Sequence, residues 1–227
     1  MTFCDRGIVL RSRPLRENDR IVTVFTREHG KLEVAFKSVR LAKGRLRALS
    51  EPVSRGDYRF FMKNDRGLPV CTGGQTLSVF PRVRLSSDLL FMACHFCEVI
   101  SKITPLYQPS PDKYDLLLGA LEHLEARGDG AGMSSRPSAA EVAGHATIGP
   151  WTRRAFALRA LDAAGFGFRH TSVGLDARVW DVLHVGSWNE VRGLDSDERA
   201  LDVLDDMLRR FFSEQLDQRL HTLEFVR

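Results

Sequence analysis

The first 82 residues of the chain carry the apolar and polar pattern of β-strands. In residues 31–37 (KLEVAFK), Leu32, Val34 and Phe36 face one way and the charged residues face the other, the period of two expected when one side of a strand is buried. Residues 20–26 (RIVTVFT) are almost all β-branched or aromatic, as in a buried strand. Strands are also predicted at residues 5–13, 53–62 and 70–79, with turn chemistry at 64–67 (NDRG). Five short strands that close on one another predict a small β-barrel.

Beyond Pro81 the apolar residues recur with a helical period instead. Residues 86–104 are apolar nearly all round and keep their polar positions on one narrow stripe, which predicts a helix near the centre of a bundle. Further helices are predicted at residues 111–126, 151–164 and 195–219. The predicted fold class is therefore α+β, with an N-terminal five-stranded OB-fold β-barrel followed by an all-α helical-bundle domain.

The pattern places a domain boundary between residues 82 and 83. Residues 1–82 are expected to form the barrel domain and residues 83–227 the helical domain. Residues 127–149, rich in Gly, Ser and Ala, are expected to be a mobile connection within the helical domain. Residues 168–194 have no clear period, and a hairpin around 179–191 is one interpretation of them.

The charge distribution separates the same two parts. Residues 1–82 contain 17 Lys and Arg against 8 Asp and Glu, whereas residues 83–227 contain 16 against 21. A basic first part and a mildly acidic second part indicate a polyanion-binding module joined to a scaffold or partner-binding module. The alternative is uneven surface charge without a function, since most charge runs are solvated faces.

The cationic residues that carry this hypothesis come from the predicted strands and from the basic stretch after them. Phosphate backbones bind to grooves lined by cations because neutralised phosphates release condensed counterions. Arg can also stack on unpaired bases. Tyr58 is the best candidate for an exposed aromatic platform among strand aromatics that are mostly expected in the core. The candidate nucleic-acid-binding residues are Arg11, Arg13, Arg16, Arg20, Lys31, Lys37, Arg40, Lys43, Arg45 and Arg47.

Several segments, in order along the chain, resemble the RecO family of bacterial DNA-repair proteins. GIVLRSRPLREND and RIVTVFTREHGKLEVAFKSVR are similar to the opening strands of that family, and LAKGRLRALS to the basic segment that follows them. YDLLLGALEHLE, FALRALDAAGFG and LRRFFSEQLDQRLHTLEFVR resemble helices of the family's second domain. The resemblance implies an OB-fold domain that binds single-stranded DNA and possibly duplex DNA. It also implies strand annealing, and recombinase loading together with RecR and the single-strand DNA-binding protein.

The sequence departs from that family in one respect. Many members carry two Cys-x-x-Cys pairs that hold zinc after the Gly-x-Gly segment, but His170 and Val173 stand where the first pair would fall. Residues 165–227 contain three histidines without metal-ligand spacing and no cysteine, which cannot make a closed tetrahedral zinc site. No metal is expected in this zinc-less remnant region, residues 168–194, and packing around Trp180 or Trp188 is expected to replace it.

Nothing in the sequence indicates an enzyme or a cofactor. Cys94 and Cys97 form a lone pair inside an apolar helix and are interpreted as core residues. The histidines have no metal-ligand spacing and no nucleophile beside them, and the Gly-rich stretch at 128–133 lacks the context of a phosphate loop. An unrecognised enzyme site stays open as an alternative, as does an RNA-binding OB-fold protein of translation or ribosome assembly.

Partner binding and location follow from weaker signals. Arg153, Arg154 and Arg159, or Arg209 and Arg210, can receive an acidic partner tail, although ordinary surface arginines are the simpler interpretation. The chain opens on a strand-like segment without the apolar core of a signal peptide, and no apolar run is long enough to span a bilayer. A cytoplasmic, nucleoid-associated protein without membrane partners is therefore expected.

Overall fold

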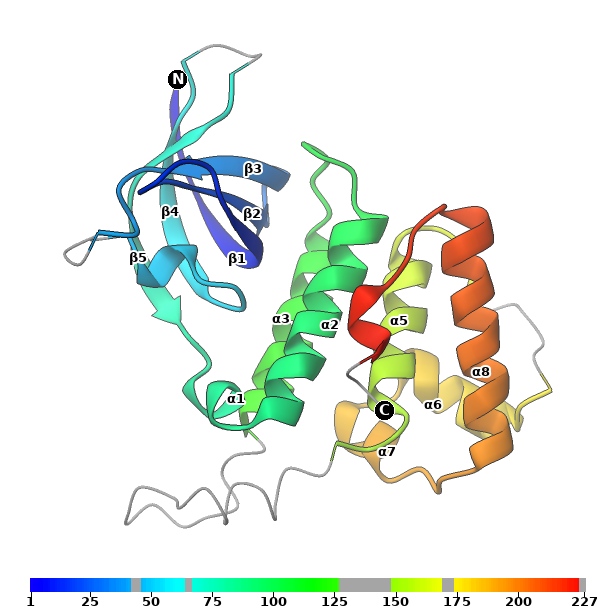
Figure 1. The fold of residues 1–227 in the computed structure, drawn as a ribbon. Coiled ribbons are helices and arrows are strands. Elements are labelled where there is room, and N and C mark those ends of the chain that lie inside the picture. The colour runs from blue at the N-terminus through cyan, green and yellow to red at the C-terminus, as the bar shows by residue number, and fades with distance from the viewer. Residues whose placement is uncertain (42–45, 64–66, 127–147, 169–173, 225–227) are drawn as a thin grey trace, which may run out of the picture. The chain divides into compact units, whose positions relative to one another are not determined.

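The computed structural model describes residues 1–41, 46–63, 67–126, 148–168 and 174–224. The chain divides into two compact units. The first unit comprises Met1–Pro81 and Thr104–Leu118, and the second comprises Arg82–Ile103 and Gly119–Arg227. All the strands among the described residues lie in the first unit, and the second is helical (Figure 1). The predicted α+β fold is confirmed. The expected connection at residues 127–149 falls almost wholly outside the described residues.

Five strands form a closed barrel in the order β1-β2-β3-β5-β4 (Figure 1). The strands are β1 (Thr2–Pro14), β2 (Arg20–Thr26), β3 (Gly30–Phe36), β4 (Arg55–Phe61) and β5 (Val70–Ser78). The first half of β1 pairs with β4 and its second half with β2, so β1 is longer than the predicted 5–13 segment. A parallel contact between Ala35 and Val70 closes the barrel.

The alternation seen in the sequence decides what fills the barrel. Leu32, Val34 and Phe36 on β3 are buried in one core cluster with Val22 and Val24 on β2. These five side chains meet because β2 and β3 pair in a register that sets Val24 against Leu32 and Val22 against Val34. Burial of apolar side chains of this size stabilises the fold by about 1.5–3 kcal/mol each.

The outer side of β2 and β3 is partly covered by the Thr104–Leu118 segment of the same unit. Phe25 is turned away from the barrel core yet is fully buried, because its ring lies 6.0 Å from the ring of Tyr114. The backbone N–H of Tyr107 donates to the carbonyl of Lys31 at 2.9 Å, and Lys31 bridges to Leu106. This end of the OB-fold surface is therefore occupied by the chain itself.

Helices make up the second unit and supply its core. Phe96 of α2 (Ser87–Ile103) stacks on Phe156 of α5 (Thr152–Ala163), with the ring centroids 4.1 Å apart. Cys97 is buried beside these rings. Burial raises the pKa of the Cys97 thiol, which fits the predicted core role. The predicted helices at 86–104, 111–126 and 151–164 are confirmed. The helices of the described chain are α1 (Pro81–Leu85), α2 (Ser87–Ile103), α3 (Pro111–Ala126), α5 (Thr152–Ala163), α6 (Ala177–Val185), α7 (Trp188–Arg192) and α8 (Glu198–Arg210).

The hairpin considered around residues 179–191 is wrong, because this stretch forms the two helices α6 and α7. Asp176 caps α6 by accepting hydrogen bonds from the N–H groups of Arg178 and Val179. Ser187 and Glu190 form a reciprocal capping box at the start of α7. Such caps satisfy the N–H groups left unpaired in the first helical turn, and they outweigh the β-propensity of the valines.

The final helix is shorter than the predicted 195–219 segment. The α-helix α8 ends at Arg210, and one π-helical turn, Phe211–Gln215, follows it. Asp217 then takes a left-handed backbone conformation with φ of 48°, and the N–H of Gln218 donates back to the carbonyl of Phe212. A left-handed residue closed by such a bond is a common way for a helix to end. The apolar period alone did not indicate this stop.

The polar stripe of α2 anchors the segment near the end of the described chain. The carboxylate of Glu98 accepts hydrogen bonds from the N–H groups of His221 and Thr222 and from the Thr222 hydroxyl. The Nδ1 atom of His95 lies 2.7 Å from the same hydroxyl. His95 is almost fully buried. Part of the polar stripe of α2 is therefore an internal polar contact.

Acid is expected to destabilise the protein through His95. Burial lowers the pKa of His95 from 6.5 to about 4. The unfolded chain therefore binds a proton that the folded protein excludes, so the contribution is complete above pH 6.5 and is lost as the pH falls towards 4. Between pH 6.5 and 5 the free energy of unfolding should drop by about 1–2 kcal/mol from this group.

Urea unfolding over that pH range measures the effect. His95→Gln should flatten the pH dependence relative to the unchanged protein. Identical pH profiles for the unchanged protein and His95→Gln would contradict the assignment.

Among the described residues, no helix is both long and apolar enough to cross a membrane.

Candidate nucleic-acid interface

Two loops meet at the end of the barrel where β1 ends and β2 begins. The N–H of Ser38, just after β3, donates to the carboxylate of Asp19 in the β1–β2 loop at 2.9 Å. The N–H of Arg40 donates to the carbonyl of Asn18 at 3.2 Å. These bonds hold the two loops side by side, and their cations belong to one surface. Arg16, Lys37 and Arg40 are exposed on these loops.

A third basic segment is tied to the same end. The guanidinium of Arg20 contacts the carboxylate of Glu51 at 2.8 Å, which fixes the short 3-10 helix Ala48–Ser50 there. Arg47 is exposed immediately before that helix. We call the set Arg16, Arg20, Lys37, Arg40 and Arg47 the loop-end cluster. Arg20 is partly neutralised by Glu51, so the exposed cations of the cluster carry most of its field.

The other candidate cations fall outside this cluster to different degrees. Arg11 and Arg13 are exposed on the outer side of β1, opposite Thr23 and Ile21 of β2. Arg13 leads towards the loop end, but its guanidinium contacts Glu33 at 3.2 Å with both side chains well exposed. Lys31 lies at the opposite end of β3, beside the covering segment. Lys43 and Arg45 lie outside the described residues.

Tyr58 is not an exposed stacking platform, as the sequence had suggested. Its ring is buried in the barrel, 5.6 Å from the ring of Phe60, and its hydroxyl donates to the carbonyl of Leu49 at 3.2 Å. Burial also raises the pKa of this phenol, so it stays neutral. The exposed aromatic of this strand is Phe61, one of the strand aromatics that were mostly expected in the core. The alternation of inward and outward side chains along β4 was the signal that distinguishes the buried Tyr58 from the exposed Phe61.

Two of the helical-domain arginines are buried, not surface groups awaiting a partner. Arg153 and Arg154, at the start of α5, both contact the carboxylate of Asp205 on α8 at 2.5 Å. Both arginines are at least nine-tenths buried by residue. These two residues are therefore not ordinary surface arginines, and their side chains are not exposed to receive the acidic tail of a partner. Desolvation lowers the pKa of the Arg154 guanidinium.

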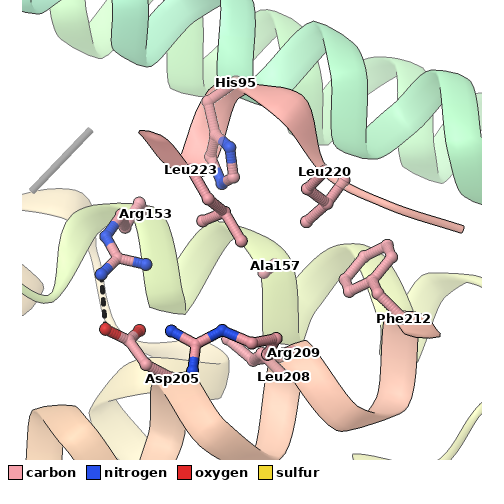
Figure 2. Close-up of a pocket in the computed structure, with 9 residues that line it drawn as sticks. All are labelled: His95, Arg153, Ala157, Asp205, Leu208, Arg209, Phe212, Leu220 and Leu223. Carbon is pink, nitrogen blue, oxygen red and sulfur yellow. Dashed lines mark hydrogen bonds and ion pairs between the residues drawn. The ribbon is translucent and has the colours of Figure 1, made fainter. Parts of the chain in front are cut away.

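A small pocket of about 60 Å³ lies beside this ion pair. Figure 2 shows Arg153 joined to Asp205 at one side, with His95 and Leu223 opposite them and Phe212 at the far end. Apolar side chains supply most of the remaining wall. The exposed Arg209 lines the pocket as well, and it pairs with Asp206 at 2.9 Å on the helix surface.

Arg159 organises part of the zinc-less remnant region, residues 168–194. Its guanidinium donates to the carbonyls of Val182, Leu183 and Gly186 at the end of α6. It also lies 4.5 Å from the ring centre of Trp188. A cation at a helix C-terminus satisfies carbonyls that have no helical partner. Within the described chain, no three His, Cys, Asp or Glu side chains gather in a metal-binding group.

The strand order and the helices after it define an OB-fold domain within an α+β protein. Residues 1–80 match the family model described as "Recombination protein O N terminal". The N-terminal part of the chain is therefore similar to the N-terminal domain of the RecO family, and the resemblance inferred from the sequence is confirmed.

Whole proteins of that family are also similar to this chain. "DNA repair protein RecO" of Streptomyces coelicolor is 37% identical over 141 residues, covering 57% of this chain and 54% of the relative. The protein of the same name in Listeria monocytogenes serotype 4a is 32% identical over 125 residues, covering 55% and 48%. The chain spans about half the length of the curated relatives it matches.

Proposed function

We propose that the chain is a non-enzymatic DNA-binding mediator of recombination in DNA repair. The observation that carries this proposal is the loop-end cluster, in which three separate basic segments meet at one end of an OB-fold barrel. The names of the similar proteins support a role in DNA repair. The division of labour expected from the charge distribution assigns nucleic acid to the barrel and protein partners to the helices.

The proposed action is to hold single-stranded DNA, and in some settings duplex DNA, mainly through phosphates. A bound strand loses part of its charge, so a second strand approaches it against less repulsion and annealing becomes faster. No covalent bond is made or broken, and no cofactor or metal is needed. The proposed setting is the cytoplasm, in association with the nucleoid.

Recombinase loading with RecR and the single-strand DNA-binding protein belongs to the same proposal. If the acidic tail of the latter protein docks on the helical unit, exposed Arg209 and Arg210 are better placed to receive it than Arg153 and Arg154, which are already paired. Annealing of complementary strands, with and without a coat of single-strand DNA-binding protein, tests the mediator role beyond plain affinity.

The affinity for single-stranded DNA should fall steeply with salt and depend on the loop-end cluster. The triple change Arg16→Ala, Lys37→Ala and Arg40→Ala should weaken binding about 30-fold near 0.1 M salt and reduce the slope of log K against log salt by about 2. Fluorescence anisotropy of a labelled oligonucleotide across a salt series measures both quantities. Lys31→Ala, at the other end of β3, is the matched control and should alter affinity less than about threefold.

Salt-independent binding, or no binding at low salt, would contradict the proposal. Competition between DNA and RNA strands of matched sequence separates it from the RNA-binding alternative, since a strong preference for RNA would favour that alternative.

A further inference from the structure

The first half of β1, strand β4 and strand β5 present an exposed sheet face on the barrel. Along β4 the side chains alternate: Tyr58 and Phe60 fill the barrel core, whereas Asp57, Arg59 and Phe61 are exposed. The pairing registers set Cys4 of β1 and Gly73 of β5 on either side of Arg59. We call this surface the β4–β5 face. Its residues are Thr2, Cys4, Arg6, Asp57, Arg59, Phe61, Thr72, Gly73 and Gln75.

The chemistry of this face suits a nucleic-acid strand. Its two cations, Arg6 and Arg59, outnumber its single carboxylate, Asp57. Phe61 is 42% exposed, and its cross-strand partners are Thr2 of β1 and Val70 of β5. A cation beside an exposed aromatic ring provides a contact for a phosphate and a surface for a base in neighbouring positions.

The middle of the face has no side chain to obstruct a ligand. A Cβ atom built on Gly73 meets no atom within 4 Å, so the space above this residue is open. Gly73 is the direct neighbour of Arg59 across the β4–β5 pairing. Thr72 and Gln75, both exposed on β5, add a hydroxyl and an amide along the same path. An extended strand can therefore approach the sheet closely while it contacts Arg59 and Phe61.

We propose that the β4–β5 face is a second binding site for single-stranded DNA, distinct from the loop-end cluster. This inference rests on the proposed DNA-binding function and extends it. The two sites belong to different parts of the barrel: the cluster comes from the β1–β2 loop and the segments after β3, whereas the face comes from β4, β5 and the first half of β1.

A single strand fits this face better than a duplex does. Stacking on Phe61 requires a base whose ring face is free, and the bases of a duplex are already stacked inside it. The described residues of the face stand on paired strands and include no helix that could enter a groove. With one strand at each site, a single molecule holds two strands close together with their charges partly neutralised. That arrangement accelerates annealing directly.

Substitutions at Gly73 test the proposal without disturbing the fold, because the new side chain enters open space. Gly73→Glu places a negative charge beside Arg59, and Gly73→Lys places a positive charge at the same point. In the full-length chain, Gly73→Glu should weaken binding of a second oligonucleotide about tenfold and Gly73→Lys should strengthen it about threefold. Phe61→Leu keeps an apolar side chain but removes the ring, and should weaken second-strand binding about tenfold.

The readout is energy transfer between donor- and acceptor-labelled oligothymidines, which cannot pair with each other, together with the anisotropy of the first strand bound. We expect the unchanged protein to bind two strands, with first-strand affinity unaltered within twofold in the Gly73 variants. Annealing of complementary strands should fall in Gly73→Glu and rise in Gly73→Lys.

The outcomes distinguish a failure of the second site from a failure of the proposed function. A protein that binds one oligothymidine through the loop-end cluster but never a second overturns the second site and leaves the proposed function intact. The same holds if Gly73→Glu and Gly73→Lys behave alike. A protein that binds no oligonucleotide at low salt overturns both.

Discussion

Replacing Asp205 with alanine should lower the free energy of unfolding by about 3–5 kcal/mol, among the largest effects of any single substitution in the chain. Its carboxylate contacts the guanidinium groups of both Arg153 and Arg154 at 2.5 Å, and both arginines are buried. Without Asp205, two like charges remain next to each other with little access to water. A buried charge that loses its partner cannot recover its hydration, which is why the loss exceeds that of a surface pair.

Its neighbour in sequence provides the control for this prediction. Asp206 pairs with Arg209 at 2.9 Å, but both side chains are more than three-fifths exposed. Asp206→Ala should therefore change stability by less than about 0.5 kcal/mol. Urea unfolding of the two variants under the same conditions measures the contrast. Equal effects at the two positions would show that the contacts of Asp205 with Arg153 and Arg154 do not hold α5 against α8.

Gly30→Ala should destabilise the barrel by about 3 kcal/mol. Gly30 ends the turn between β2 and β3 with φ of 73°, a conformation that residues with a Cβ atom adopt at a cost. A Cβ atom there would lie 2.1 Å from the carbonyl oxygen of Gln108 in the covering segment. The nearest atoms all belong to the backbone of Gln108, so no flexible side chain can move away. The segment Thr104–Leu118 would therefore have to shift from the sheet.

Gly73→Ala serves as the matched glycine control. The space around its Cβ position is open, and the substitution should be neutral or slightly stabilising, by less than about 1 kcal/mol. Thermal unfolding followed by circular dichroism compares the two variants. If Gly30→Ala unfolds at the same temperature as Gly73→Ala, the tight packing of the β2–β3 turn does not contribute to stability.

Local pattern was sufficient for much of the fold. The strand at 20–26 and the helix at 111–126 have the bounds of β2 and α3, because side-chain period and end signals were both strong there. Residues 179–191 and 211–219 were misjudged for a related reason. In the first stretch two local caps outweighed β-propensity, and in the second a turn at Asp217 stopped the helix before its apolar period ended.

The sequence by itself determined the order of strands and helices, the basic character of the first 82 residues and the family resemblance, because these depend on neighbours along the chain. Only the tertiary structure decided which cations act together. The loops that carry Arg16 and Arg40 lie together because they bond to each other, whereas Arg153 and Arg154 are held by Asp205, about fifty residues away. Charge can be read from composition, but whether a charge is free to bind a ligand depends on contacts between distant segments.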